Sequence, residues 1–117
     1  MSIPGFPNYL SLAGPFAHSG LSFFNIMEYQ MRHMHRLFTE VRRRGATTFE
    51  VTDDASAAFL ERMTKKLDNT VFNRGNCATS RSYYFNHAGE AILLRPTSTR
   101  NAVHEGSNFP LSAYRIS

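Results

Sequence analysis

A single long helix is the strongest structural signal in this sequence of 117 residues. Apolar residues recur at three- and four-residue spacing from Ser22 to Arg44, which is the periodicity of one helical face. Ser22 is a suitable N-cap because its hydroxyl can accept a hydrogen bond from an amide of the first turn, and Gly45 suits the left-handed position after the last turn. The expected apolar stripe consists of Phe23, Phe24, Met27, Met31, Met34, Phe38 and Val41, widened by Ile26 and Leu37.

This stripe needs a partner surface that the rest of the chain supplies only in part. A domain of this size buries a limited fraction of its surface, and ten Phe residues without a Trp are a heavy aromatic load for it. We therefore expect the stripe to be core packed on a sheet that is largely absent from this chain. Some of the rings are expected on a surface that something else covers.

Shorter patterns on both sides of the helix predict an α/β fold. Residues 9–13 predict a buried strand that stops at Gly14-Pro15, and the alternating residues 47–51 predict a second strand. A second helix is expected at about residues 54–68, with Glu61 and Lys65 paired on its exposed side. Residues 73–76 suggest a loop, residues 82–94 a β-hairpin, and the remaining tail is expected to be irregular.

The first predicted strand also bears on how complete the domain is. Its backbone groups need hydrogen-bonding neighbours, and nothing before residue 9 in this sequence supplies them. We therefore expect the chain to begin in the middle of a sheet and to be incomplete as a domain.

The segment from Ala13 to Ser22 is the most informative one for function, because a strand end, a glycine-containing loop and a capped helix start follow one another there. A helix start presents free backbone amides and a positive partial charge, which can receive an anion or an electron-rich carbonyl group. Gly14 and Gly20 would let a ligand approach the backbone closely. Many such joints bind nothing, so the pattern alone names no ligand.

The net charge of +4 and the isoelectric point near 9.6 permit anionic partners without requiring them. Arg32, Arg36 and Arg43 lie along one flank of the long helix and could contact phosphates. The same helix carries a complete apolar stripe, however, and arginines in its last turn suit the negative end of the helix dipole. Nucleic-acid binding is therefore not expected.

Metal, nucleophile and membrane patterns are missing from the sequence. His33 and His35 point to different sides of the helix and the other three histidines are scattered, so ordinary surface histidines and no metal site are expected. No G-x-S-x-G elbow positions a serine, and no catalytic residue is predicted. A single cysteine, Cys77, no apolar run near the roughly 18 residues of a membrane span and no secretory signal together predict a cytoplasmic protein.

Three motifs follow one another at the start of the chain. Residues 5–10 read G-F-P-N-Y-L, residues 13–15 read A-G-P, and the long helix contains Ile26-Met27-Glu28. In this order and spacing they resemble the last part of class B flavin-dependent monooxygenases, which include the Baeyer–Villiger and the flavin-containing monooxygenases. Residues 81–85 with Gly89, residues 94–97 and residues 109–114 are similar to an actinobacterial subgroup of that family, so that the resemblance covers nearly the whole chain.

The resemblance implies that residues 1–45 are the end of a Rossmann-like FAD-binding domain and residues 46–117 a C-terminal appendage. FAD and NADPH would serve the full-length enzyme, in which the reduced flavin reacts with oxygen and the resulting C4a-peroxyflavin oxygenates ketones or soft heteroatoms. The loop and the helix start would face the flavin ring, where their amides could stabilise negative charge at its N1/C2=O end. The cofactor-binding residues so implied are Gly14, Pro15, Gly20, Ser22, Phe23 and Phe24.

The sequence also departs from the family's pattern. It contains no G-x-G-x-x-G fingerprint for either nucleotide, and Phe16 follows the G-P pair where many members have Asn or Ser. We therefore expect a C-terminal section that is inactive alone, binds no FAD tightly and needs a missing N-terminal nucleotide-binding region as its partner. The alternative is a small non-enzymatic module that self-associates through the Phe/Met face of the helix.

Overall fold

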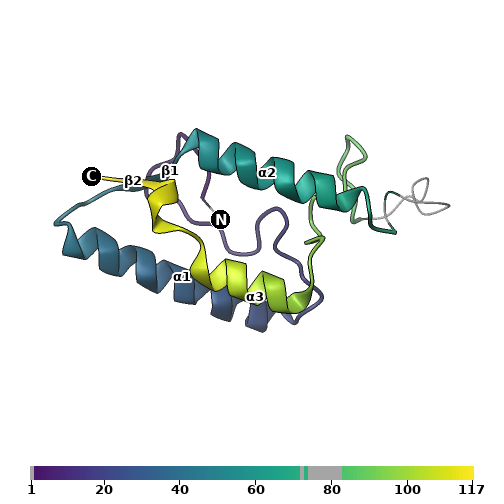
Figure 1. Ribbon diagram of the computed structural model, residues 1–117, viewed down its shortest axis with the longest axis horizontal. Coiled ribbons are helices and arrows are strands. Elements are labelled where there is room, and N and C mark those ends of the chain that lie inside the picture. The colour runs from purple at the N-terminus through teal and green to yellow at the C-terminus, as the bar shows by residue number, and fades with distance from the viewer. Residues whose placement is uncertain (1, 72, 74–82) are drawn as a thin grey trace.

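The computed structural model describes residues 2–71, 73 and 83–117 and has an elongated shape of 53 × 26 × 19 Å. Its radius of gyration is 15.4 Å, whereas a compact chain of this length would have about 13 Å. Helices α1 (Phe23–Arg43) and α2 (Asp53–Leu67) run along opposite long edges, with the N-terminal segment between them (Figure 1). Helix α3 (Thr99–Asn108) packs against α1, and strand β1 (Phe49–Val51) pairs with β2 (Tyr114–Ile116) near the C-terminus.

Helix α1 begins and ends where the sequence predicts. The Ser22 hydroxyl oxygen accepts a hydrogen bond from the Asn25 amide at 3.4 Å. At the other end Gly45 takes a φ of +63°, and its amide donates to the Arg42 carbonyl at 3.0 Å. The next amide, that of Ala46, reaches back to the Val41 carbonyl at the same distance, so the helix closes with a Schellman motif.

The predicted apolar stripe of α1 is buried only in part: Ile26 and Leu37 are buried, and Met27, Met34 and Val41 are half-buried. The buried residues of the helix are Ile26, Tyr29, His33 and Leu37, which follow one another at three- and four-residue spacing. They pack towards α3 and the sheet, the layers that this chain provides. The neighbouring face remains open to solvent, and we call it the exposed face of α1; it carries Phe23, Phe24, Met31 and Phe38, of which Phe24 is 80% exposed.

The N-terminal strand expected at residues 9–13 is not formed. Asn8, directly before it, and Ala13, its last residue, adopt left-handed backbone angles, with φ of 60° and 54°. No neighbouring strand lies beside it in the described part of the chain, and a strand without neighbours leaves its backbone groups unpaired. Asn8 instead fastens the segment to β1, because its amide donates to the Phe49 carbonyl at 2.9 Å and its side-chain oxygen accepts from the Phe49 amide at 3.1 Å.

The later part of the chain corrects two further predictions. Residues 83–94 form turns and not a β-hairpin, and Leu94 makes an isolated parallel bridge with His18; residue 82 lies outside the described residues. The tail is not irregular, because Ser98 caps α3 by accepting from the Asn101 amide at 3.2 Å. Its sequence holds few strong helix formers, so packing on α1 rather than local propensity stabilises α3.

Strand β1 and helix α2 agree with the sequence. Thr52 caps α2, and the Lys65 amino group donates to the Glu61 carboxylate at 2.6 Å. The strands form one antiparallel pair in the described chain, with Phe49 opposite Ile116. This mixture of helices with a small sheet is compatible with an α/β class. Of the loop predicted at residues 73–76, only residue 73 is described, and Cys77 also lies outside the described residues.

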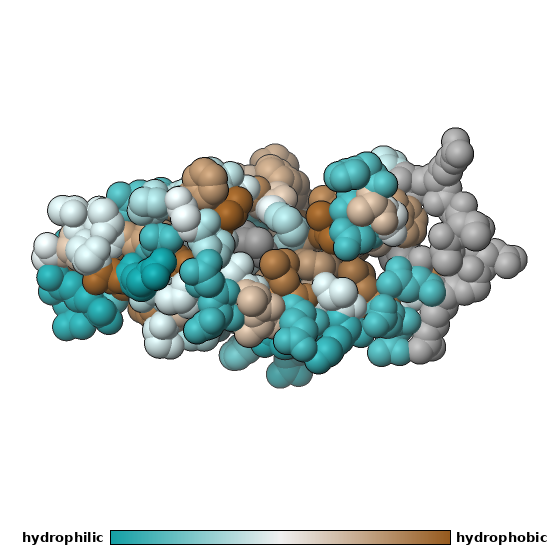
Figure 2. Space-filling view, turned by 90° about the horizontal axis from the view of Figure 1, so that it is seen from above, coloured by the Kyte–Doolittle hydropathy of each residue, from teal (hydrophilic) through white to brown (hydrophobic). Residues whose placement is uncertain are grey.

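The buried apolar residues are divided among three small clusters. The first joins Leu37 of α1 to β1 and β2, so residues on both sides of position 45 share it. The second contains Phe16, Met63 and Leu67, and the third contains Ala17, Ile26 and Tyr29. On the side of the molecule that carries α2, hydrophobic patches lie exposed among hydrophilic ones (Figure 2). A body only 19 Å deep encloses little continuous core.

Replacing Gly106 with alanine tests the contact between α1 and α3. A Cβ at this position would overlap the Tyr29 ring, at 2.5 Å from Cε2, so we expect Gly106→Ala to lower the free energy of unfolding by about 1–3 kcal/mol. Helix propensity alone would favour alanine by about 1 kcal/mol. Urea unfolding of Gly106→Ala measures whether the free energy of unfolding falls or rises, with the exposed α3 variant His104→Ala as the control. A more stable Gly106→Ala variant would contradict the close contact between Tyr29 and Gly106.

Candidate functional site

The segment before α1 is fixed by backbone bonds to residues 92–95. The Phe16 amide donates to the Ile92 carbonyl at 2.6 Å, and the His18 amide to the Leu93 carbonyl at 3.2 Å. The Arg95 amide completes the pairing by donating to the His18 carbonyl at 2.8 Å. Residues from the end of the chain therefore hold the predicted cofactor-binding loop in place, a role that the sequence did not reveal.

The turn at Gly14-Pro15 is strained, although not at the glycine. Ala13 and Phe16 on its two sides have φ of 54° and 57°, whereas Gly14 is not among the residues with positive φ. A bulky residue rarely adopts this conformation unless its surroundings stabilise it. Here the Phe16 side chain is 1% exposed and packs in the cluster with Met63 and Leu67, so its burial offsets the strain.

The other four predicted residues lie together at the exposed start of α1. Gly20 has a φ of +77°, and a Cβ there would meet nothing within 4 Å, so the space beside its backbone is open. Phe23 and Phe24 are 53% and 80% exposed, and their amides donate no hydrogen bond to a described residue. The geometry thus offers two free amides beside open space, which suits an anion or a polarised carbonyl oxygen.

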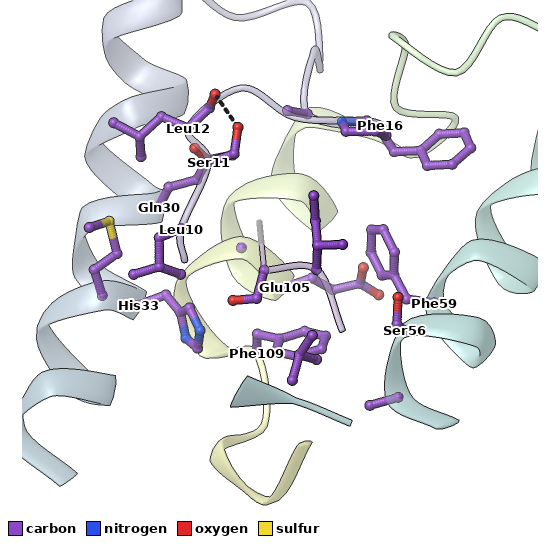
Figure 3. Close-up of a pocket in the computed structure, with 18 of the residues that line it drawn as sticks. Leu10, Ser11, Leu12, Phe16, Gln30, His33, Ser56, Phe59, Glu105 and Phe109 are labelled. Carbon is purple, nitrogen blue, oxygen red and sulfur yellow. Dashed lines mark hydrogen bonds between the residues drawn. The ribbon is translucent and has the colours of Figure 1, made fainter. Parts of the chain in front are cut away.

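A second feature was not expected from the sequence: a partly open cavity of about 260 Å³, lined mainly by the N-terminal segment and the three helices. Figure 3 shows side chains from these elements converging on it. Pro15 is the predicted cofactor-binding residue that lines its wall. The labelled residues in the view are Leu10, Ser11, Leu12, Phe16, Gln30, His33, Ser56, Phe59, Glu105 and Phe109.

His33 lies in this wall, and its prediction as an ordinary surface histidine is wrong. It is 8% exposed, and its Nε2 lies 3.0 Å from the Tyr114 hydroxyl oxygen, which also accepts from the Ser2 hydroxyl at 3.4 Å. Burial, followed by the nearby positive charge of Arg36, lowers the pKa of His33 from 6.5 to about 4. Its spacing from Tyr29 and Leu37 is the sequence signal that would have placed it on the buried face.

Arg95 and Glu105 form a partly buried ion pair beside the cavity. The Arg95 side chain is 6% exposed, and its guanidinium donates to the Glu105 carboxylate and, at 3.0 Å, to the Thr97 hydroxyl. Burial lowers the pKa of Arg95, with Glu105 acting in the opposite direction. The pair joins α3 to the segment that holds residues 16–18, and it leaves the cavity wall without net charge.

Arg32, Arg36 and Arg43 of α1, and Arg44 directly after it, have partners within the chain. Arg32 donates to Glu28 at 2.6 Å, and Arg36 donates to the carbonyls of Ser107 and Phe109 at 3.0 and 3.3 Å, at the end of α3. Arg43 and Arg44 both bind Glu40, whose pKa they lower to about 2. These contacts favour a structural role over phosphate binding. Among the described residues no three His, Cys, Asp or Glu side chains gather as a metal site would require.

Comparisons with known proteins add no name to these features. No protein-family model, no curated protein and no solved structure matches the chain. Within the described residues, none of the helices combines the length and the apolar content that crossing a membrane requires.

The burial of His33 predicts how stability depends on pH. Its folded pKa of about 4 lies below the ordinary 6.5, so between these values the unfolded chain binds more protons than the folded one. The contribution of the neutral His33 ring to stability is therefore fully present well above pH 6.5 and decreases as the pH falls towards 4, by at most about 3 kcal/mol. Urea unfolding at several pH values should show a flatter profile for His33→Leu than for the exposed control His35→Leu, and identical profiles would contradict the assignment.

Proposed function

We propose that this chain is the C-terminal section of an FAD- and NADPH-dependent monooxygenase that oxygenates ketones or soft heteroatoms. In this proposal residues 1–45 end a Rossmann-like FAD-binding domain, and the start of α1 forms one wall of the flavin site. The motifs at residues 5–10, 13–15 and 26–28 support the family. FAD reduced by NADPH would supply the oxygen-activating chemistry.

The observation that carries the proposal is the open helix start. The free amides of Phe23 and Phe24 lie at the positive end of the 21-residue helix α1, beside the open backbone of Gly20. A reduced flavin ring accumulates negative charge at its N1/C2=O end, and preorganised amides stabilise such charge. The exposed rings of Phe23 and Phe24 add apolar surface next to this position, which suits an aromatic cofactor.

The exposed face of α1 supports the same assignment. Four large apolar side chains along one helix face are costly to leave in water, and such a surface marks a place where another protein surface binds. A nucleotide-binding region from outside this sequence would cover this face and bring the two G-x-G-x-x-G fingerprints that the sequence lacks.

The isolated chain should therefore carry no cofactor. We expect the purified protein to show no absorbance at about 450 nm after gel filtration in the presence of FAD, and no oxidation of NADPH, because one wall cannot hold the pyrophosphate. Flavin retained at one molecule per chain would overturn this prediction. An in-frame G-x-G-x-x-G in the coding sequence upstream of residue 1 would support the assignment, and a separate gene without such a motif in its vicinity would oppose it.

The exposed face also favours a second candidate, a non-enzymatic module that pairs with itself. Phe23, Phe24, Met31 and Phe38 would then lie in an interface between two copies. Light scattering at increasing concentration tests this reading. A defined dimer with a cooperative melt, abolished by Met31→Glu and retained by the exposed-position control Thr39→Glu, would favour it over the flavin proposal. A dimer that survives Met31→Glu would oppose it.

A further inference from the structure

The cavity occupies the place where the three core clusters would otherwise meet. Its wall takes Tyr114 and Val51 from the first cluster, Phe16 from the second, and Tyr29 and Ala17 from the third. Its volume of about 260 Å³ exceeds the roughly 150 Å³ at which an apolar cavity in a protein binds a molecule the size of benzene. The chain thus surrounds a volume that suits a small organic ligand.

The chemistry of the wall limits which ligand fits. Aliphatic and aromatic side chains supply most of it, and several of the polar groups at its edge already have partners. The Tyr29 hydroxyl donates to the Ala17 carbonyl at 3.1 Å, and the Gln30 side-chain oxygen accepts from the Ala13 amide at 3.2 Å. Arg95 and Glu105 neutralise each other. An ion entering the cavity would lose its hydration without gaining a free counter-charge, so a neutral ligand is favoured.

His33 is a polar residue of the wall with one ring nitrogen that has no partner among the described residues. More than nine-tenths of its surface is buried, its ring lines the cavity, and its Nδ1 has no hydrogen-bond partner among the described residues. Since the Ser2 hydroxyl donates to Tyr114, the Tyr114 hydroxyl proton can be donated to Nε2 of His33. The neutral ring then carries its proton on Nδ1, which leaves one buried donor without an acceptor. Because this nitrogen is itself buried, a ligand in the cavity does not reach it, and it sets no preference for a ligand oxygen.

We propose that this cavity is a binding site for a neutral, mainly apolar molecule of about the size of a substituted benzene. The site does not depend on the flavin proposal, because its walls come entirely from this chain and the helix start of α1 lies outside its lining.

A cavity-filling substitution with a matched control tests the site. Ala55 lines the cavity from α2, whereas Ala57 on the same helix is exposed and does not, so Ala55→Leu and Ala57→Leu make the same chemical change in two places. With toluene and benzyl alcohol as probes, followed by amide chemical shifts of the full chain, we expect saturable binding to wild type and Ala57→Leu. Ala55→Leu should weaken binding by about tenfold or more.

The chemical shifts of the wild-type protein test the site without relying on a variant that could fail to fold. Binding in the cavity should shift the amides of Leu12, Phe16 and Phe109 and leave those of the exposed face of α1, such as Phe38, unchanged. Shifts along the exposed face, equal binding to Ala55→Leu and Ala57→Leu, or no saturable binding of either probe would overturn the proposal.

Discussion

The contact of the Tyr29 ring with Gly106 joins helix α1 to helix α3. The ring lies where a side chain on α3 would be, so α1 and α3 approach closely only because residue 106 is glycine. Its hydroxyl group reaches further and donates to the Ala17 carbonyl at 3.1 Å, which ties the loop before α1 to the same helix pair. One buried side chain therefore sets the spacing of two helices and the position of the loop that the flavin proposal uses. The cavity lies between the same elements, since Tyr29, Ala17 and Gly106 all line it.

Helix α1 shows how far periodicity alone determines a structure. Its start, its end and its caps at Ser22 and Gly45 could be predicted, because capping depends on groups within a few residues. The face that it buries could not be predicted from its own sequence. Two neighbouring faces both carry residues at helical spacing, and the choice between them depends on where α3 and the sheet lie. The face with Tyr29 and His33 contains polar atoms, so its pattern is weaker, although Tyr114 and the Ala17 carbonyl satisfy two of these atoms. The Phe/Met face has the stronger pattern, yet Phe23, Phe24, Met31 and Phe38 on it remain exposed.

The candidate site divides in the same way. The helix start after Gly20 could be predicted from local sequence, since glycine and a capping serine have local consequences. The pairing of Phe16 and His18 with residues 92–95 could not, nor could the grouping of His33 with Tyr114 and Ser2, because these contacts join residues far apart in the chain. The strand expected at residues 9–13 failed for a related reason, since a strand depends on a neighbour and none lies beside it in the described part of the chain.

The open start of α1 is the proposed place for the isoalloxazine ring of a flavin. Riboflavin supplies this ring without the pyrophosphate that needs a nucleotide-binding domain, so the full chain can be titrated with it and followed through its amide chemical shifts. We expect weak binding with shifts concentrated at Gly20, Phe23 and Phe24, at the start of α1 where the free amides lie. Shifts of equal size at Met31 and Phe38, further along the same exposed face, would show unspecific apolar contact and contradict it, as would the absence of any shift at the helix start.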